Sequence, residues 1–233
     1  MKAAVVIYPG SNCDRDTIYV LQELLGCPVQ LVWHTEHELQ GAHLVVLPGG
    51  FSYGDYMRPG ALAARAQIMP AVISHAKSGK PVLGICNGFQ VLTECGLLPG
   101  ALLQNRGTCF LCQDAYISVM NIKTPFTNLY RQGQTLRLSI AHADGRYYAE
   151  PEQLLELEAN NQVIFRYTDG QGEPLGDGSP NGSALGIAGI TNAAGNVLGM
   201  MPHPERHCEG VLGGSDGRWL FESVISSWKG LVN

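Results

Sequence analysis

The sequence contains a cysteine in a setting that favours nucleophilic chemistry. Cys86 follows a short apolar run, residues 82–85, that is typical of a buried strand, and it precedes apolar residues at helical spacing. Gly84 and Gly88 flank it, as a sharp turn from strand to helix requires. The N–H groups and the dipole at a helix start stabilise a thiolate. We therefore predict that Cys86 is a nucleophile and not a buried, inert thiol.

A base and a carboxylate that could serve this thiol come much later in the chain. His203 and Glu205 flank Pro204, and proline keeps its neighbours extended, so both side chains should project from one side of the chain. Glu205 could then hold one imidazole nitrogen while the other faces the thiol. An isolated His-x-Glu pair is usually a surface feature, but this pair follows a predicted strand. We predict a triad of Cys86, His203 and Glu205.

A glycine-rich loop, residues 48–60, follows another apolar run. In open α/β sheets the loops at the carboxyl ends of the strands form the ligand crevice, so this loop and the turn at Cys86 should face each other. Gly49 and Gly50 could direct backbone N–H groups toward the thiol, and the N–H of Asn87 could supply a second donor. Together these groups would form an oxyanion hole.

The remaining patterns predict the elements that position these residues. Alternating apolar runs and helical stretches in the first half imply a parallel sheet, and residues 192–196 should join an antiparallel hairpin. Residues 9–12, which lack the lysine of a phosphate loop, should form a strand-to-helix turn with a Ser or Asn cap. Strands are expected at residues 3–8, 29–33, 44–47, 82–85, 108–119, 136–141, 162–167, 185–191 and 197–201. Helices are expected before Gly26, at 61–76, after Cys86, at 151–159 and at 216–228.

These elements indicate an α/β protein with three layers: a mostly parallel open sheet, flanking helices and an added antiparallel β segment. No internal repeat or linker interrupts the 233 residues, so we expect a single domain over residues 1–233. Hydrophobic residues make up 45% of the chain and charged residues 15%, which is typical of a well-packed core.

The charge and the cysteines exclude several classes of function. The formal net charge is −5, and scattered Lys and Arg form neither a basic stripe for nucleic acid nor a polybasic membrane patch. Seven irregularly spaced cysteines indicate free thiols, no apolar run reaches membrane-spanning length, and no leader precedes the first strand, so we expect a cytoplasmic protein. Cys109 and Cys112 have the CxxC form but lack a second ligand pair, so we expect no metal site.

In type and order, these blocks resemble those of the class I (triad) glutamine amidotransferases. The nucleophile motif corresponds to Gly84-x-Cys86-x-Gly88-x-Gln90, and the other two blocks to Pro48-Gly49-Gly50 and His203-Pro204-Glu205. The stretches 9–14, 48–56, 84–90, 97–101 and 199–206 are more closely similar to free-standing glutaminase subunits of purine biosynthesis. They span nearly the whole chain. Residues 141–146 depart from the Ala-His-Gly-Glu-Gly form of those relatives, with the shorter Asp144 in place of glutamate.

The resemblance implies a flavodoxin-like fold and a mechanism. The Cys86 thiolate would attack the side-chain amide carbon of L-glutamine, and His203 would protonate the departing ammonia and then activate water. The oxyanion would be held by backbone N–H groups of Gly50, Phe51 and Asn87. Substrate would contact Gln90 and Gly49. Substrate or a partner subunit would contact His142, Asp144 and Arg146.

The resemblance also implies partners, since free ammonia would be lost to water. The expected partners are a large synthetase subunit, which binds ATP and Mg, and a small accessory subunit; this chain itself is expected to hold no cofactor, and it has no phosphate loop. Two alternatives are a glutaminase for the synthases of pyridoxal phosphate, anthranilate, GMP or imidazole glycerol phosphate, and a non-catalytic interaction subunit. The Phe51-Ser-Tyr-Gly-Asp55 and Cys86-Asn-Gly88 stretches disfavour the first, and the intact triad disfavours the second.

Overall fold

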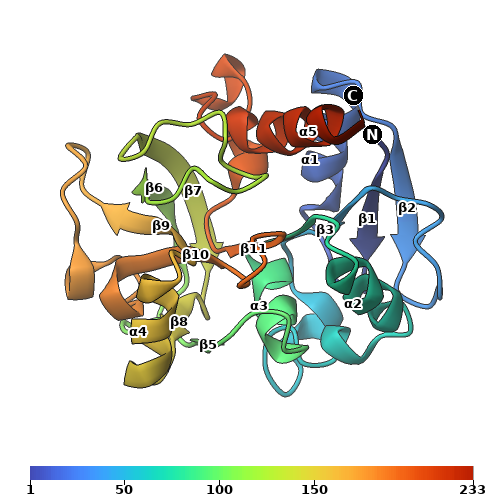
Figure 1. Cartoon of the computed structure of the whole chain (residues 1–233). Helices are drawn as coiled ribbons and strands as arrows, with labels where there is room; N and C mark the ends of the chain where they lie inside the picture. Colours follow the sequence, from blue (N-terminus) through green and yellow to red (C-terminus); the bar gives the residue numbers. More distant parts are fainter. Residues whose placement is uncertain (233) are drawn as a thin grey trace.

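The computed structural model describes residues 1–232 and is built around one nine-stranded sheet (Figure 1). Its strand order is β2-β1-β3-β4-β11-β10-β9-β6-β7, parallel from β2 to β11 and antiparallel from β11 to β7. The parallel strands are β1 (Ala3–Ile7), β2 (Val29–Trp33), β3 (Leu44–Leu47), β4 (Val82–Ile85) and β11 (Val197–Met200). The antiparallel strands are β10 (Ile187–Thr191), β9 (Val163–Thr168), β6 (Leu111–Val119) and β7 (Thr135–His142).

Helices cover both faces of the parallel half. In Figure 1, α1 and α5 lie on one side of the sheet, and α2 and α3 lie on the other. The helices are α1 (Asp14–Tyr19), which continues as a π-helical segment (Val20–Leu24), α2 (Met69–Lys77), α3 (Asn87–Glu94), α4 (Pro151–Ala159) and α5 (Arg218–Val232). A separate small ribbon pairs β5 (Ala101–Leu103) with β8 (Arg146–Tyr148). No helix within the described residues is both long and apolar enough to cross a membrane.

The burial of the strands follows from this layering. All four residues of β3 and all four of β4 are buried, as expected for strands covered on both faces by helices. The edge strand β2 alternates instead, and it leaves Leu31 and Trp33 half exposed. The predicted three-layer α/β class with an antiparallel addition is confirmed, and the antiparallel addition contributes four of the nine strands.

Most predicted strands agree with the observed ones within two residues, but two elements differ. The helix predicted at 61–76 is broken into a 3-10 turn (Ala63–Arg65), an extended residue at Ala66 and then α2. Pro70 lies in the first turn of α2, where its missing N–H is tolerated, so the helix starts there. The strand predicted from residue 108 begins at residue 111, because Thr108 has a positive φ of 53° and closes a turn with Asn105.

The predicted cap of the first helix is also wrong. The N-cap position of α1 is Cys13, and no side chain accepts a hydrogen bond there. The hydroxyl of Ser11 instead accepts from the N–H of Tyr8, at 3.2 Å, and thereby tightens the turn after β1. The side chain of Asn12 accepts from the thiol of Cys13, at 3.2 Å. The turn is therefore held by side-chain contacts outside the helix.

The pairing of β11 brings the distant motifs together. This late strand runs parallel to β4 on one side and antiparallel to β10 on the other. Consequently the residues that follow β3, β4 and β11 all lie at one edge of the sheet. The chain after β11 is also fastened to the antiparallel half, since the N–H of His203 donates to the carbonyl of Ser139 in β7, at 2.8 Å.

Candidate active site

Cys86 forms the predicted turn between β4 and α3. Its backbone is strained, with φ 50° and ψ −104°, and its N–H donates to the carbonyl of Met200 in β11 at 2.8 Å. A side chain at Gly88 would overlap the carbonyl group of Leu47 in β3, and one at Gly84 would lie 2.6 Å from the carbonyl oxygen of Gly88. The two glycines therefore allow the close backbone approach that presents the thiol at the sheet edge.

His203 and Glu205 form a buried pair beside this thiol. The Nδ1 of His203 lies 2.6 Å from Oε1 of Glu205, and each residue is only 1% exposed. Burial by itself lowers the pKa of His203, but the negative charges of Glu205 and Cys86 outweigh it and raise the pKa well above its ordinary 6.5. The Pro204–Arg206 3-10 turn directs both side chains to one side of the chain, as predicted.

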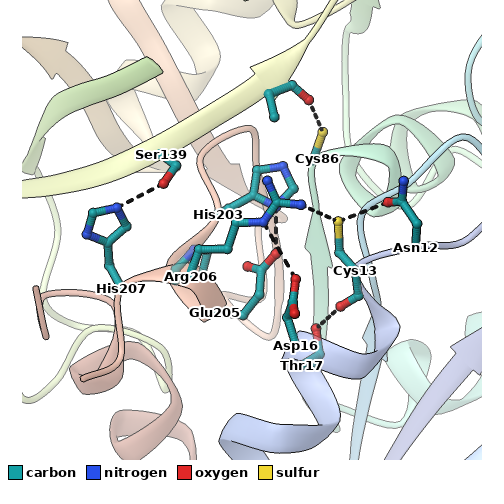
Figure 2. A network of polar contacts seen from close by, with 12 residues as sticks. Asn12, Cys13, Asp16, Thr17, Cys86, Ser139, His203, Glu205, Arg206 and His207 are labelled. Carbon is teal, nitrogen blue, oxygen red and sulfur yellow. Dashed lines mark hydrogen bonds and ion pairs between the residues drawn. The ribbon is translucent and has the colours of Figure 1, made fainter. Parts of the chain in front are cut away.

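The other ring nitrogen of His203 lies beside two thiols. Its Nε2 makes no hydrogen bond of good geometry within residues 1–232, although the thiols of Cys86 and Cys13 approach closely enough to raise the pKa of the ring. Figure 2 shows both sulfurs near His203. The thiol of Cys86 donates to the carbonyl of Ala141, at 3.7 Å. A small rotation of the Cys86 thiol would replace this weak contact by one to Nε2 of His203.

The two glycines of the loop after β3 have different roles. Gly50 has φ 142°, and a side chain there would lie 2.8 Å from the backbone nitrogen of Asn12. A side chain at Gly49 would lie 2.7 Å from Cε1 of His203 and 3.1 Å from the sulfur of Cys13. Gly50 is thus required by the backbone path, whereas Gly49 makes room for the imidazole of His203.

Replacing Gly49 by alanine is expected to impair catalysis more than stability. The new methyl group would meet the tips of two side chains, His203 and Cys13, which can move by a few tenths of an ångström. Misplacement of the imidazole on that scale should lower kcat for glutamine hydrolysis by roughly 10- to 100-fold. Steady-state kinetics together with the thermal midpoint would test this. A variant with normal kcat, or one that is unfolded, would contradict it.

The predicted oxyanion donors are not equivalent. No hydrogen bond from the N–H of Gly50 or of Asn87 is found within residues 1–232, so both are free to bind an oxyanion. The N–H of Phe51, by contrast, donates to the carbonyl of Gly10 at 3.0 Å. In this conformation, therefore, Phe51 does not fit the donor role that we predicted for it.

Other predicted contacts meet at a small cavity beside the thiol. The amide of Gln90 accepts from Asn87 Nδ2, at 2.8 Å, and donates to the backbone carbonyl of Asp144, at 2.7 Å. Gln90 thus fastens the segment after β7 to helix α3. The cavity, of about 20 Å³, is lined by Gly50, Phe51, Asp55, Cys86, Gln90, Ala141, His142, Ala143 and Asp144. Arg146 is not among these residues; its Nε donates to the carbonyl of Gln104, at 2.9 Å.

Cys13 and Arg206 belong to the site but gave no recognisable signal in the sequence. The guanidinium Nη2 of Arg206 lies 2.9 Å from the sulfur of Cys13, and its Nε lies 3.6 Å from Asp16 (Figure 2). A cavity of about 210 Å³ is bordered by Cys13, His203 and Arg206, together with the exposed rings of Phe51 and Phe110. It adjoins the cavity that contains Cys86, with which it shares Gly50, Phe51 and Ala141.

Two further clusters bring reactive side chains together. Donor atoms of Cys13, His203 and Glu205 lie within 4.8 Å of one another, a set that suits zinc, but the adjacent Arg206 guanidinium opposes a cation. Ser139 and His207 are joined at 2.8 Å (Figure 2), yet the carboxylate of Asp114 approaches the same ring nitrogen, at 3.5 Å. A hydrolytic triad needs the carboxylate on the other nitrogen, so this cluster is structural.

The fold and this site define the class of protein. A family profile described as "CobB/CobQ-like glutamine amidotransferase domain" matches residues 1–224. The chain belongs to this family of glutamine amidotransferases, which confirms the resemblance seen in its motifs.

The individual relatives have a narrower description. The phosphoribosylformylglycinamidine synthase subunit PurQ of Moorella thermoacetica is 55% identical over 229 residues, which are 98% of this chain and 97% of the relative. The PurQ subunit of Chlorobium chlorochromatii is 54% identical over 227 residues, or 97% of each chain. A chain in the structure of PurLQS from Thermotoga maritima superposes with a TM-score of 0.86 at 44% identity, covering 97% of this chain and 98% of that one.

Proposed function

We propose that this chain is the glutaminase subunit of a phosphoribosylformylglycinamidine synthase, and that residues 1–233 act as one amidotransferase domain; residue 233 lies outside the described residues. The names of the relatives and their near-complete coverage support the assignment. The single observation that carries the chemistry is the buried 2.6 Å contact between Nδ1 of His203 and Oε1 of Glu205. This contact leaves Nε2 of His203 unpaired beside the strained turn at Cys86.

In the first half of the reaction the thiolate of Cys86 attacks the amide carbon of L-glutamine. The carbonyl oxygen becomes an oxyanion, which the N–H groups of Gly50 and Asn87 stabilise. The N–H of Phe51 could join them only after its bond to Gly10 breaks. His203, which is held as an imidazolium by Glu205, gives its proton to the departing nitrogen, so that ammonia leaves and a thioester remains.

In the second half His203, now neutral, takes a proton from water as the water oxygen attacks the thioester carbon. The carbon–sulfur bond breaks, glutamate leaves, and the sulfur of Cys86 departs as a thiolate beside the imidazolium, which restores the starting state. Glu205 touches neither substrate nor product in this scheme. Its carboxylate fixes the orientation of the ring and stabilises the imidazolium, as a buried acid does in related triads.

The ammonia would be consumed by a large ATP-using synthetase subunit, which would bind Mg and formylglycinamide ribonucleotide, with a small accessory subunit in the same complex. The similarity to a chain of the Thermotoga maritima PurLQS structure supports this assembly. We place the subunit in the cytoplasm, in line with seven free cysteines, two of which, Cys109 and Cys112, are exposed.

The assignment of the nucleophile can be tested by trapping the thioester. The complex would be mixed with L-glutamine, quenched in acid during turnover and digested for mass spectrometry. We expect the mass of one glutamyl group on the peptide that contains Cys86, and its removal by hydroxylamine. A glutamyl group on Cys13 instead, or turnover without any adduct on Cys86, would contradict the proposed chemistry.

A further inference from the structure

The cavity beside Cys86 presents hydrogen-bond acceptors and negative charge, in contrast to the cavity beside Cys13. Asp55 and Asp144 both line it, and so does the buried imidazole of His142. The larger cavity on the Cys13 side contains neither acid, and the guanidinium of Arg206 borders it. The two sides of the catalytic centre therefore differ in the charge that they favour.

His142 is held in one orientation with an acceptor lone pair unused. The side chain of Asn105 donates to the carbonyls of Cys109 and His142, at 2.9 and 2.8 Å, which fixes its Oδ1 as an acceptor. That oxygen accepts from the N–H of Gly145, at 3.0 Å, and from Nδ1 of His142, at 3.1 Å. The proton of the neutral ring is thereby placed on Nδ1, and Nε2 becomes an acceptor.

This acceptor has no donor. His142 is only 3% exposed, and its Nε2 has no hydrogen-bond partner within residues 1–232. Burial, followed by the charge of His203, lowers the pKa of His142 to about 4, so the ring stays neutral near pH 7. Buried acceptors without donors are rare because they lose the hydrogen bond that water would provide. The natural occupant of this position is a group rich in N–H donors.

Asp55 adds a carboxylate oxygen that is likewise buried without a hydrogen-bond donor. It belongs to the Ser52–Asp55 turn, has a positive φ of 56°, and its Oδ1 is buried without a hydrogen-bond partner. Burial, followed by the negative charge of Asp144, raises the pKa of Asp55 to about 6. Two acids that repel each other across a cavity are relieved by a cation between them.

Resting on the function proposed above, we infer that Asp55, Asp144 and His142 bind the α-ammonium group of L-glutamine while its amide carbon meets Cys86. An ammonium has three N–H donors and one positive charge, which matches one neutral acceptor and two carboxylates. The departing amide nitrogen is assigned to the other side, since it takes its proton from His203, which borders the Cys13 cavity.

The size of the cavity agrees with a site for one end of the substrate only. About 20 Å³ accommodates a single small polar group such as water or ammonium. A whole glutamine molecule does not fit there, so the rest of the substrate has to extend into the adjoining cavity of about 210 Å³, which shares Gly50, Phe51 and Ala141 with the small one. Gln90, which bridges α3 and the backbone of Asp144, fixes the wall of the small cavity.

The test compares L-glutamine with glutaramate, the same amide without its α-amino group, in the complete complex with the synthetase. The variants are Asp55→Asn and Asp144→Asn, with Glu152→Gln on the exposed face of α4 as a control of equal charge change. For both cavity variants we expect kcat/KM for L-glutamine to fall by roughly 10- to 100-fold. The value for glutaramate should stay at that of the wild type, and the control should change neither.

The ratio of the two substrates within one variant is independent of how much of that variant is folded. The inference is overturned if kcat/KM for L-glutamine is unchanged in both cavity variants, or if the values for both substrates fall together. It is also overturned if the wild-type enzyme uses both amides equally. Loss of glutamine hydrolysis in the wild-type complex would instead refute the proposed function, so the two failures can be distinguished.

Discussion

Replacing Cys86 by serine is expected to reduce glutamine-dependent synthesis by the complex by a factor on the order of 10⁴ or more. A serine hydroxyl ionises far less readily than a thiol, so the variant offers almost no anionic nucleophile to the amide carbon. Synthesis from added ammonia should continue at the wild-type rate, because that reaction needs only the synthetase partner. Initial rates with each nitrogen source would measure both effects.

A matched control is available on the same helix. Cys95, the C-cap residue of α3, is a partly buried free thiol away from the catalytic groups, and Cys95→Ser should leave both rates unchanged. If Cys86→Ser retained glutamine-dependent turnover near the wild-type rate, Cys86 would not be the nucleophile. If it also lost ammonia-dependent synthesis, the substitution would have disrupted the assembly and not only the chemistry.

Replacing Gly88 by alanine is expected to destabilise the protein by about 3 kcal/mol or more. The new methyl group would overlap the carbonyl of Leu47, a backbone group in the buried strand β3, and a strand cannot swing away as a flexible side chain can. The turn at Cys86 would have to move off the sheet edge, so activity should be lost as well. Urea unfolding followed by circular dichroism measures the change in free energy.

Gly107→Ala is the appropriate comparison for this experiment. A side chain at Gly107 would meet no atom within 4 Å, and its φ is not positive, so its stability should stay within about 0.5 kcal/mol of the wild type. Equal stability of the two variants would show that α3 does not pack against β3 as closely as the structure has it.

The strands were predictable because their signals are local. Residues 44–47 and 82–85 are short apolar runs, and both prove to be strands buried on each face. The helix predicted at 61–76 failed because its apolar periodicity continues across Ala66, where the backbone is extended before Pro70 opens a new helix. Periodicity describes which face is apolar, and it carries no information on where the hydrogen-bond ladder is interrupted.

The proposed triad was accessible from the sequence for the same reason. Cys86 has its glycines beside it, and His203 has Glu205 two residues away, so each half is recognisable within a few positions. Two other contacts could not be recognised in this way. The contact of Arg206 with Cys13 joins residues 193 positions apart, and the hydrogen bond between Asn105 and His142 joins residues 37 positions apart. Such contacts depend on the assembled sheet, and nothing in either local stretch specifies the other.

The central position of β11 has a consequence for biosynthesis. A ribosome makes the chain from the N-terminus, and the slot between β4 and β10 stays empty until Val197–Met200 has emerged. Cys86, the proposed nucleophile, is thus translated more than a hundred residues ahead of His203, its proposed base. With the proposed triad, a nascent chain that stalls before this strand cannot waste glutamine, because Cys86, His203 and Glu205 meet only when synthesis of the polypeptide is nearly finished.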